Sequence, residues 1–222
     1  MQTYAQSSKG LDPASVAAAV NQPDRRLILG SSSVYRRDLL MRLRIPFDVQ
    51  APKVDETPLA NEAPSALASR LALGKAREVA KRFPQAIVIG SDQVADLRGM
   101  ALGKPGNHAR ATAQLQQMRG HIVIFQTDVS VVCLATRFEA SSLAAVRVQF
   151  RDLSDAEIDN YLRAEQPYDC AGSAKSEGLG IALLSVIDSD DPTALIGLPL
   201  IRTCDLLRSA GVNLLATAAA TS

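Results

Sequence analysis

The chain has 222 residues, of which 47% are hydrophobic and 21% are charged, and its formal net charge is +1. A chain of this length and composition can bury a sizeable core, in one large α/β domain or two small lobes, without disulfide or metal staples. The near-neutral charge excludes a whole-protein field that would attract nucleic acid or an anionic membrane, so any anionic ligand must be held by locally placed cations.

The cysteines and the two ends of the chain indicate a cytoplasmic protein. Cys133, Cys170 and Cys204 are odd in number, far apart and without metal-ligand spacing, so a disulfide framework is not expected. No apolar run approaches the roughly 20 residues that span a bilayer. Residues 1–25 lack the basic start and apolar core of a signal peptide, and we expect a disordered extension there. A flexible tail is expected over 214–222.

The first half of the chain predicts alternating strands and helices. In chain order we expect a buried strand at 26–30, a helix over 32–45, a strand at 47–52, a helix over about 64–83 and a strand at 86–90. Such alternation is typical of parallel βα units.

The second half predicts an antiparallel ribbon flanked by helices. We expect a helix over 107–118, long strands at 121–135 and 141–150, a helix over 154–165, a strand at 180–189 and a last helix over 199–211. Ser154 and Glu157 form a Ser-x-x-Glu capping box at the start of the fourth helix. The fold class predicted for the whole chain is therefore mixed α/β.

Two segments, "LILGSSS" and "IVIGSDQ", share the order strand, Gly, Ser. Ligands of α/β sheets bind beyond the carboxyl ends of strands, so these two segments are expected to form two walls of one site. Asp92 follows the second strand, where burial would require a metal, a cation or a role as a base. Lys104, between Gly103 and Pro105, could supply the cation; the alternative is an Asx-type turn with a surface lysine.

Basic residues on two helices are further candidates. Arg36 and Arg37 occupy the first turn of a helix, where cations oppose the helix dipole, so either they bind a phosphate or they are simply solvated. Lys75 interrupts the otherwise apolar row that includes Leu71 and Val79. Its ammonium could reach the surface along its own aliphatic stem or point into a cleft.

Carboxylates on loops and the two histidines could each have either a functional or a purely structural role. Asp55 and Glu56 suit a hard divalent metal, but such pairs are also common on solvated loops. Glu177 lies in a glycine-rich segment that could approach a ligand or could be a flexible surface loop. His108 and His121 are too few for a histidine-rich zinc site, and we expect surface or structural roles for them.

Five segments in order resemble the Maf family of nucleoside triphosphate pyrophosphatases. They are "LILGSSSVYRRDLL", "VDETP", "VIGSDQVADLRGMALGKP", "YDCAGSAKSEGLGIAL" and "ALIGLPLIRTCDLL". The resemblance covers about residues 26–213, and the pairing of "SDQ" with "KSEG" resembles the subgroup that acts on 7-methylguanosine triphosphate. It implies an elongated mixed sheet, one catalytic domain of two lobes around a cleft, and a homodimer.

The resemblance also implies roles for individual residues. Asp92 matches the family's catalytic proton acceptor, and with Glu56 it would hold a divalent metal cation, Mg²⁺ or Mn²⁺. The matching polar cleft residues that would bind the substrate are Ser31, Arg36, Arg37, Lys75 and Lys104. The positions linked to base choice are Tyr35, Gln93 and Glu177.

Three positions depart from the family pattern. Val34 stands where proline is usual, and Tyr35 replaces a tryptophan of the subgroup while keeping an aromatic plane. Asp128 stands where the family generally has glycine, and it is expected to add negative charge near the triphosphate path.

The resemblance implies hydrolysis of 7-methyl-GTP to the monophosphate and pyrophosphate. Alternatives are a pyrophosphatase for pyrimidine or other noncanonical triphosphates, and a regulatory or binding protein in septum formation. The partner expected in each enzymatic case is a nucleoside triphosphate, with no nucleic acid polymer and no membrane.

Overall fold

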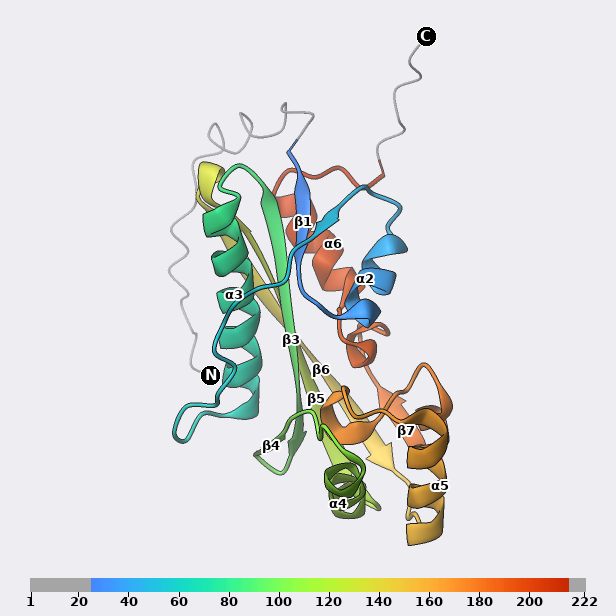
Figure 1. Ribbon diagram of the computed structural model, residues 1–222. Coiled ribbons are helices and arrows are strands. Elements are labelled where there is room, and N and C mark those ends of the chain that lie inside the picture. Colours follow the sequence, from blue (N-terminus) through green and yellow to red (C-terminus); the bar gives the residue numbers. More distant parts are fainter. Residues whose placement is uncertain (1–24, 216–222) are drawn as a thin grey trace, which may run out of the picture.

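Seven strands form one mixed sheet along the long axis of the molecule (Figure 1). The computed structural model describes residues 25–215. The strands are β1 (Leu27–Gly30), β2 (Asp48–Val49), β3 (Ile87–Leu97), β4 (Met100–Leu102), β5 (Ile122–Cys133), β6 (Phe138–Phe150) and β7 (Leu184–Asp188). Their order is β2-β1-β3-β5-β6-β7, and β4 pairs with β3. The pairs that β1 makes are parallel, whereas the other pairs are antiparallel.

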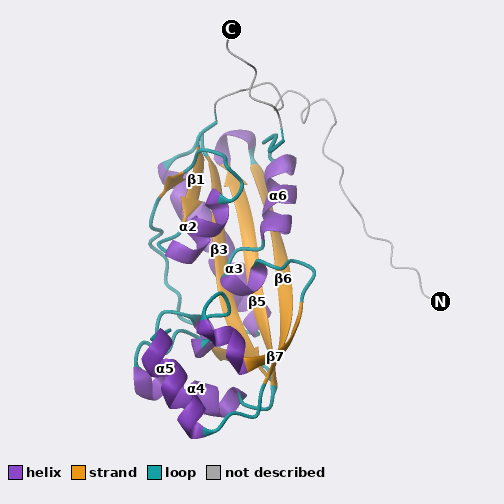
Figure 2. Ribbon diagram, turned by 90° about the vertical axis from the view of Figure 1, so that its right-hand side faces the viewer, coloured by secondary structure: helices purple, strands orange, loops and turns teal. Residues whose placement is uncertain are grey.

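Helices cover both faces of the sheet and one of its ends. The α-helices are α2 (Val34–Met41), α3 (Pro64–Arg82), α4 (His108–Met118), α5 (Asp155–Glu165) and α6 (Leu200–Ser209). Short 3-10 turns are η1 (Leu134–Thr136), η2 (Ala171–Ser173), η3 (Leu179–Leu183) and η4 (Ala194–Ile196). Helix α3 lies on one face and α2 and α6 on the other, while α4 and α5 gather at the far end (Figures 1 and 2). Within residues 25–215 no helix is long and apolar enough to cross a membrane.

Strand alternation decides which helix each side chain meets. Ile28 and Val88 pack with Val79 of α3 in one buried cluster. The neighbouring Leu29 and Ile89 pack in another cluster with residues of α2 and α6. Because successive side chains of a strand point to opposite faces, the even-numbered residues of β3 face α3. This alternation applies directly to Asp92 and Gln93, which follow on the same strand.

A separate buried cluster fills the far end of the sheet. There Phe125 and Phe150 pack with Met118 of α4 and Ile158 of α5. The capping box predicted at the start of α5 is confirmed: Ser154 N donates to Glu157 Oε2, and Glu157 N donates to Ser154 Oγ. The long strands β3, β5 and β6 thus carry two regions of core, one at each end.

The structure confirms the mixed α/β class, the parallel start and the antiparallel ribbon. It corrects several boundaries. The helix predicted over 32–45 spans only Val34–Met41, because Ser33 caps its start and Arg44, with φ of 53°, leaves the helical region before Pro46. The strand predicted at 47–52 pairs only at Asp48–Val49. Of the strand predicted at 180–189, the first residues form η3 and pairing begins at Leu184.

The most consequential correction concerns β3. The strand predicted to stop at residue 90 continues to Leu97, because β5 pairs with it without interruption from Val88 to Asp96. Asp92 therefore lies within a strand and does not follow its end. The short β4 that folds back on β3 was not predicted. The predicted flexible segments 1–25 and 214–222 fall almost wholly outside the described residues and stay predictions.

Candidate active site

A gap in strand pairing opens a cavity beside β3. On the edge away from β5, β3 pairs with β1 as far as Gly30–Gly90 and with β4 from Ala95–Leu102 onward. Residues 91–94 between these pairs have an open edge. A cavity of about 400 Å³ lies here, and its walls come from the start of α2, the middle of α3, the turn after β4, the segment after α5 and η4. The site is therefore built where β1 ends and β3 continues.

Lys75 of α3 points its ammonium into this cavity. Its Nζ lies 2.6 Å from Asp92 Oδ1 and 2.7 Å from Glu56 Oε1, and its side chain is 6% exposed. This geometry excludes the alternative in which the lysine reaches the surface along its stem. It also shows that Glu56 does not belong to a merely solvated loop, because its carboxylate shares one buried cation with Asp92.

Gly90 allows α3 to approach the strand closely enough for that contact. A Cβ at this position would lie 2.3 Å from the carbonyl oxygen of Ala72 and 2.6 Å from the backbone nitrogen of Ala76. No real side chain tolerates such distances to the backbone. The glycine of "IVIGSDQ" thus brings the helix turn that carries Lys75 down onto the strand that carries Asp92.

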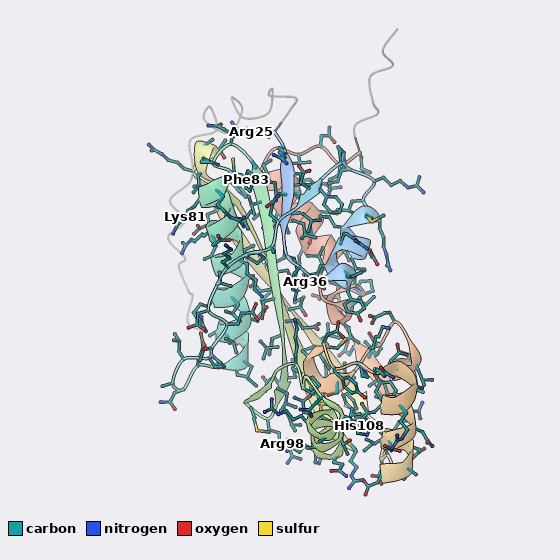
Figure 3. The ribbon with its side chains drawn as sticks, in the orientation of Figure 1. Arg25, Arg36, Lys81, Phe83, Arg98 and His108 are labelled. Atoms are coloured by element: carbon teal, nitrogen blue, oxygen red, sulfur yellow. The ribbon has the colours of Figure 1, made fainter. Side chains whose placement is uncertain are left out.

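Two further cations surround the Glu56 carboxylate. Burial raises its pKa, but the hydrogen bond from Lys75 and the charges of Lys75, Lys104 and Arg36 outweigh burial, so the net pKa lies below its ordinary value. Burial lowers the pKa of Arg36, against the opposing effect of the nearby carboxylates. Arg36 is held by donation from Nε to the Gly197 carbonyl at 2.8 Å, and it lies near the middle of the molecule (Figure 3). This part of the cavity concentrates positive charge around two carboxylates.

A different set of residues forms the other part of the cavity. Tyr35 interacts with Cys170, Asp169 and Glu177, and burial together with these groups raises the pKa of its phenol. Burial raises the pKa of the Cys170 thiol to about 12. Burial likewise raises the pKa of Glu177 above its ordinary value. An aromatic ring and two carboxylates lie together here.

Gln93 is fixed on the face of the sheet opposite Lys75. Its Nε2 lies 3.0 Å from Thr127 Oγ1 and 2.9 Å from each of the Ala194 and Leu195 carbonyl oxygens. An amide NH₂ has two hydrogens, so these three acceptors occupy it fully. The side chain is held by η4 and can offer its carbonyl oxygen to a ligand in the cavity.

Two predicted substrate-binding residues do not line the cavity. Arg37 is exposed and bonds Asp38 of its own helix through Nε and Nη2. Ser31 is buried, and its Oγ accepts from Ser33 N at 3.1 Å. The hydroxyl organises the turn before α2, while the next residues, Ser32 and Ser33, do line the cavity.

Asp128, expected to add negative charge near the triphosphate path, lies next to the site but does not line the cavity. It is opposite Asp92 in the β3–β5 pairing and is 2% exposed. Ser69 Oγ donates to its Oδ2 at 2.7 Å, and Ser130 Oγ donates to its Oδ1 at 3.2 Å. Burial raises its pKa, and the Asp92 charge adds to this effect. Two serines thus satisfy the carboxyl group that stands in place of glycine.

The histidines lie away from the cavity, as predicted. His108 contacts Tyr168 Oη at 3.1 Å and Asp159 Oδ1 at 3.0 Å, and as the first residue of α4 it lies at the far end of the molecule (Figure 3). His121 contacts Arg98. Both side chains therefore serve surface or structural contacts.

Sequence reasoning missed three parts of the cavity wall. These are Asp169, Cys170 and the backbone of η4 with Gly197. The signal was present, since "YDCAG" and "ALIGLP" belong to the segments that carry the resemblance. Neither has a charge pattern or spacing that points to a ligand, and η4 contributes through carbonyl groups that any sequence has.

Comparison with known proteins identifies the family. The model of the family described as Maf-like protein matches residues 26–210. The chain is 69% identical over 200 residues to a 7-methyl-GTP pyrophosphatase of Polaromonas sp. strain JS666, covering 90% of this chain and 91% of the relative. It is 69% identical over 191 residues to a protein of the same name from Albidiferax ferrireducens, covering 86% and 96%. A further relative of that name, from Methylobacillus flagellatus, is 54% identical over 189 residues, covering 85% and 98%. The chain belongs to the Maf family.

Proposed function

We propose that the protein is a hydrolase that cleaves 7-methyl-GTP between its α- and β-phosphates, releasing the monophosphate and pyrophosphate. The observation that carries the proposal is the division of one cavity into two parts. Arg36, Lys75 and Lys104 supply the charge that a triphosphate requires, while Tyr35 and Glu177 offer an aromatic plane and a carboxylate to a base. A guanine methylated at N7 is cationic, so an anionic, aromatic base pocket favours it. The names of the relatives agree with this substrate.

Asp92 is the group proposed to activate water. Its carboxylate lies in a mostly enclosed position, 7% exposed, within the open-edged part of β3. It would accept a proton from a water molecule aligned with the α-phosphorus, opposite the leaving pyrophosphate. Lys75, Lys104 and Arg36 would stabilise the negative charge that builds on the leaving group. Lys75 Nζ also donates to Asp92 Oδ1 at 2.6 Å, which fixes the position of the carboxylate.

Asp92 and Glu56 fit a divalent cation only together with the substrate. Both carboxylates approach the same ammonium, so they lie close enough to share one small ion, and their oxygens suit Mg²⁺ or Mn²⁺. Among the residues that the structure describes, no group of three or more acidic, histidine or cysteine side chains could hold a metal by itself. Phosphate oxygens would complete the coordination. Such an ion would neutralise charge on the phosphates.

The proposed function is tested by pyrophosphate release from a panel of triphosphates. The panel contains 7-methyl-GTP, GTP, dTTP, UTP and a damaged nucleotide, each with and without Mg²⁺ or Mn²⁺. We expect the highest kcat/KM for 7-methyl-GTP. A preference for dTTP or UTP would replace the proposal with the pyrimidine alternative, and no pyrophosphate from any member would favour a binding role.

The proposal also covers the oligomeric state and the cellular location of the protein. We propose a homodimer, as the family resemblance implies, and sedimentation equilibrium of the full chain tests it by mass. We also propose a cytoplasmic location, for which three cysteines without disulfide partners in the described structure are the support.

A further inference from the structure

The loop that carries Glu177 is folded around the carboxylate of Glu165. This residue is the last of α5, and its side chain is 15% exposed. Its Oε1 accepts from Lys175 Nζ at 2.7 Å, and its Oε2 accepts from the backbone nitrogen of Leu179 at 2.8 Å. One carboxylate therefore binds both ends of the five-residue stretch that has Glu177 at its centre.

Glycines let the loop close on this carboxylate. A Cβ at Gly178 would lie 2.8 Å from Glu165 Oε2, and a Cβ at Gly180 would lie 2.5 Å from the Lys175 carbonyl oxygen. Gly178 N also donates to that carbonyl at 3.1 Å. The glycines of "KSEGLG" thus serve the packing of the loop on Glu165.

The contact with Glu165 also fixes the position of the Lys175 ammonium. Lys175 pairs with Glu165, and its ammonium lies 5.8 Å from the centre of the Tyr35 ring. Its backbone nitrogen is held by Tyr161 Oη at 3.1 Å. Among the described residues no ion pair joins Lys175 to Glu177, although the two charges interact through space. The Glu177 carboxylate lines the cavity without a salt-bridge partner among the described residues, so it can pair with a ligand.

We propose that Glu165 is a positioning residue for base choice: it fixes the Glu177 loop and holds the Lys175 ammonium away from the Glu177 carboxylate. The inference rests on the proposed function, because it assigns to Glu177 the recognition of a cationic base. After Glu165, the carboxylate whose charge acts most strongly on Lys175 is Glu177, so loss of the Glu165 charge leaves Glu177 as its main anionic partner. That ion pair would cancel the attraction for a methylated ring and would affect neutral guanine less.

The test uses Glu165→Gln, which keeps the shape and one acceptor but removes the charge. Dissociation constants for 7-methyl-GTP and GTP are measured in chains that also carry Asp92→Asn, so that binding is read without turnover. We expect the preference for 7-methyl-GTP to fall about tenfold. The control is Glu157→Gln on the same helix, which loses the same charge while glutamine still completes the capping box.

A double substitution separates positioning from general damage. Adding Lys175→Met to Glu165→Gln removes the competing ammonium, so most of the preference for 7-methyl-GTP should return. The inference is overturned if Glu165→Gln leaves the preference unchanged, or if the double variant stays as low as the single one. Failure of the proposed function has a different signature: the unaltered chain would release no pyrophosphate from 7-methyl-GTP, whatever the binding preferences are. Absence of any 7-methyl-GTP binding would overturn both.

Discussion

Lys75 shows how one residue can be required by several others. An unpaired ammonium in a buried position costs several kcal/mol, so Lys75 is stable there only beside Asp92 and Glu56. The buried Asp92 carboxylate depends on the lysine in turn, whereas Glu56 is exposed to solvent. The three side chains come from a helix, a strand and a loop, and their mutual neutralisation fixes the relative positions of these elements.

Asp92→Asn should lower kcat for 7-methyl-GTP by about 10²-fold or more, because an amide cannot accept the proton from water. The fold should persist, since Glu56 still pairs with Lys75. Pyrophosphate release measures the activity, and circular dichroism checks the fold. Asp152→Asn, at an exposed position, is the matched control and should keep full activity. Near-normal turnover of the Asp92 variant would remove this residue from the mechanism.

Glu177 should make base choice dependent on pH. Burial raises its pKa above the ordinary value of 4.5, so its charge is lost at a higher pH than for an exposed glutamate as pH falls. The methylated ring stays cationic in this range, and the preference for 7-methyl-GTP over GTP should therefore decline on acidification. The ratio of kcat/KM values is measured from about pH 6.5 to about pH 4.5.

Glu177→Gln provides the control for this titration, because its side chain carries no charge at any pH. Its preference for 7-methyl-GTP should be lower by about tenfold, roughly 1.4 kcal/mol, and flat across the same range. If the unaltered chain gave an equally flat ratio, Glu177 would not sense the charge of the ring.

At the scale of elements, the contact between α3 and β3 positions Asp92, the proposed catalytic group. Backbone atoms of the helix approach Gly90 so closely that no side chain fits. The same helix also contributes Ser69 to the buried Asp128 and Lys75 to Asp92. Helix α3 is thus joined to the sheet by close packing at Gly90 and by polar contacts to Asp92 and Asp128.

Gly90→Ala should destabilise the protein by about 1–3 kcal/mol, because the added Cβ displaces α3 from the strand. The activity should fall as well, since Lys75 moves with the helix. Gly74→Ala on α3 is the matched control: a Cβ there meets nothing within 4 Å, and alanine favours the helix by about 0.5–1 kcal/mol. Urea denaturation gives both free energies of unfolding. Equal stabilities of the two variants would contradict the close-packing argument.

At the scale of the whole molecule, the sheet places the cavity where one strand ends and its neighbour continues. Side chains from both halves of the chain line it: Arg36, Lys75 and Lys104 come from the first half, and Asp169, Cys170 and Glu177 come from the second. Among the described residues no group of three or more acidic, histidine or cysteine side chains could hold a metal, so the proposed cation would depend on the substrate for part of its coordination.

Removal of divalent metal should therefore abolish turnover while leaving the fold intact. Thorough EDTA treatment should stop pyrophosphate release, and added Mg²⁺ or Mn²⁺ should restore it. The melting temperature without nucleotide should change little on EDTA treatment, because the protein alone offers an incomplete site. Full turnover in EDTA would contradict a metal requirement, and a large drop in melting temperature would indicate a site complete without substrate.

By itself, the sequence determined the mixed α/β class, most elements, the family and most of the charged residues around the cavity. Hydrophobic periodicity and short motifs involve residues that are close together in the chain, so they can be recognised from the sequence. The tertiary structure alone decided that Asp92 lies within β3, since only pairing with β5 extends that strand through polar residues. It alone decided that Lys75 points into the cavity, that Arg37 does not line it, and that Asp128 is buried under two serines. The extension of β3, the direction of Lys75 and the burial of Asp128 each depend on a partner distant in the chain, and no local pattern specifies such a partner.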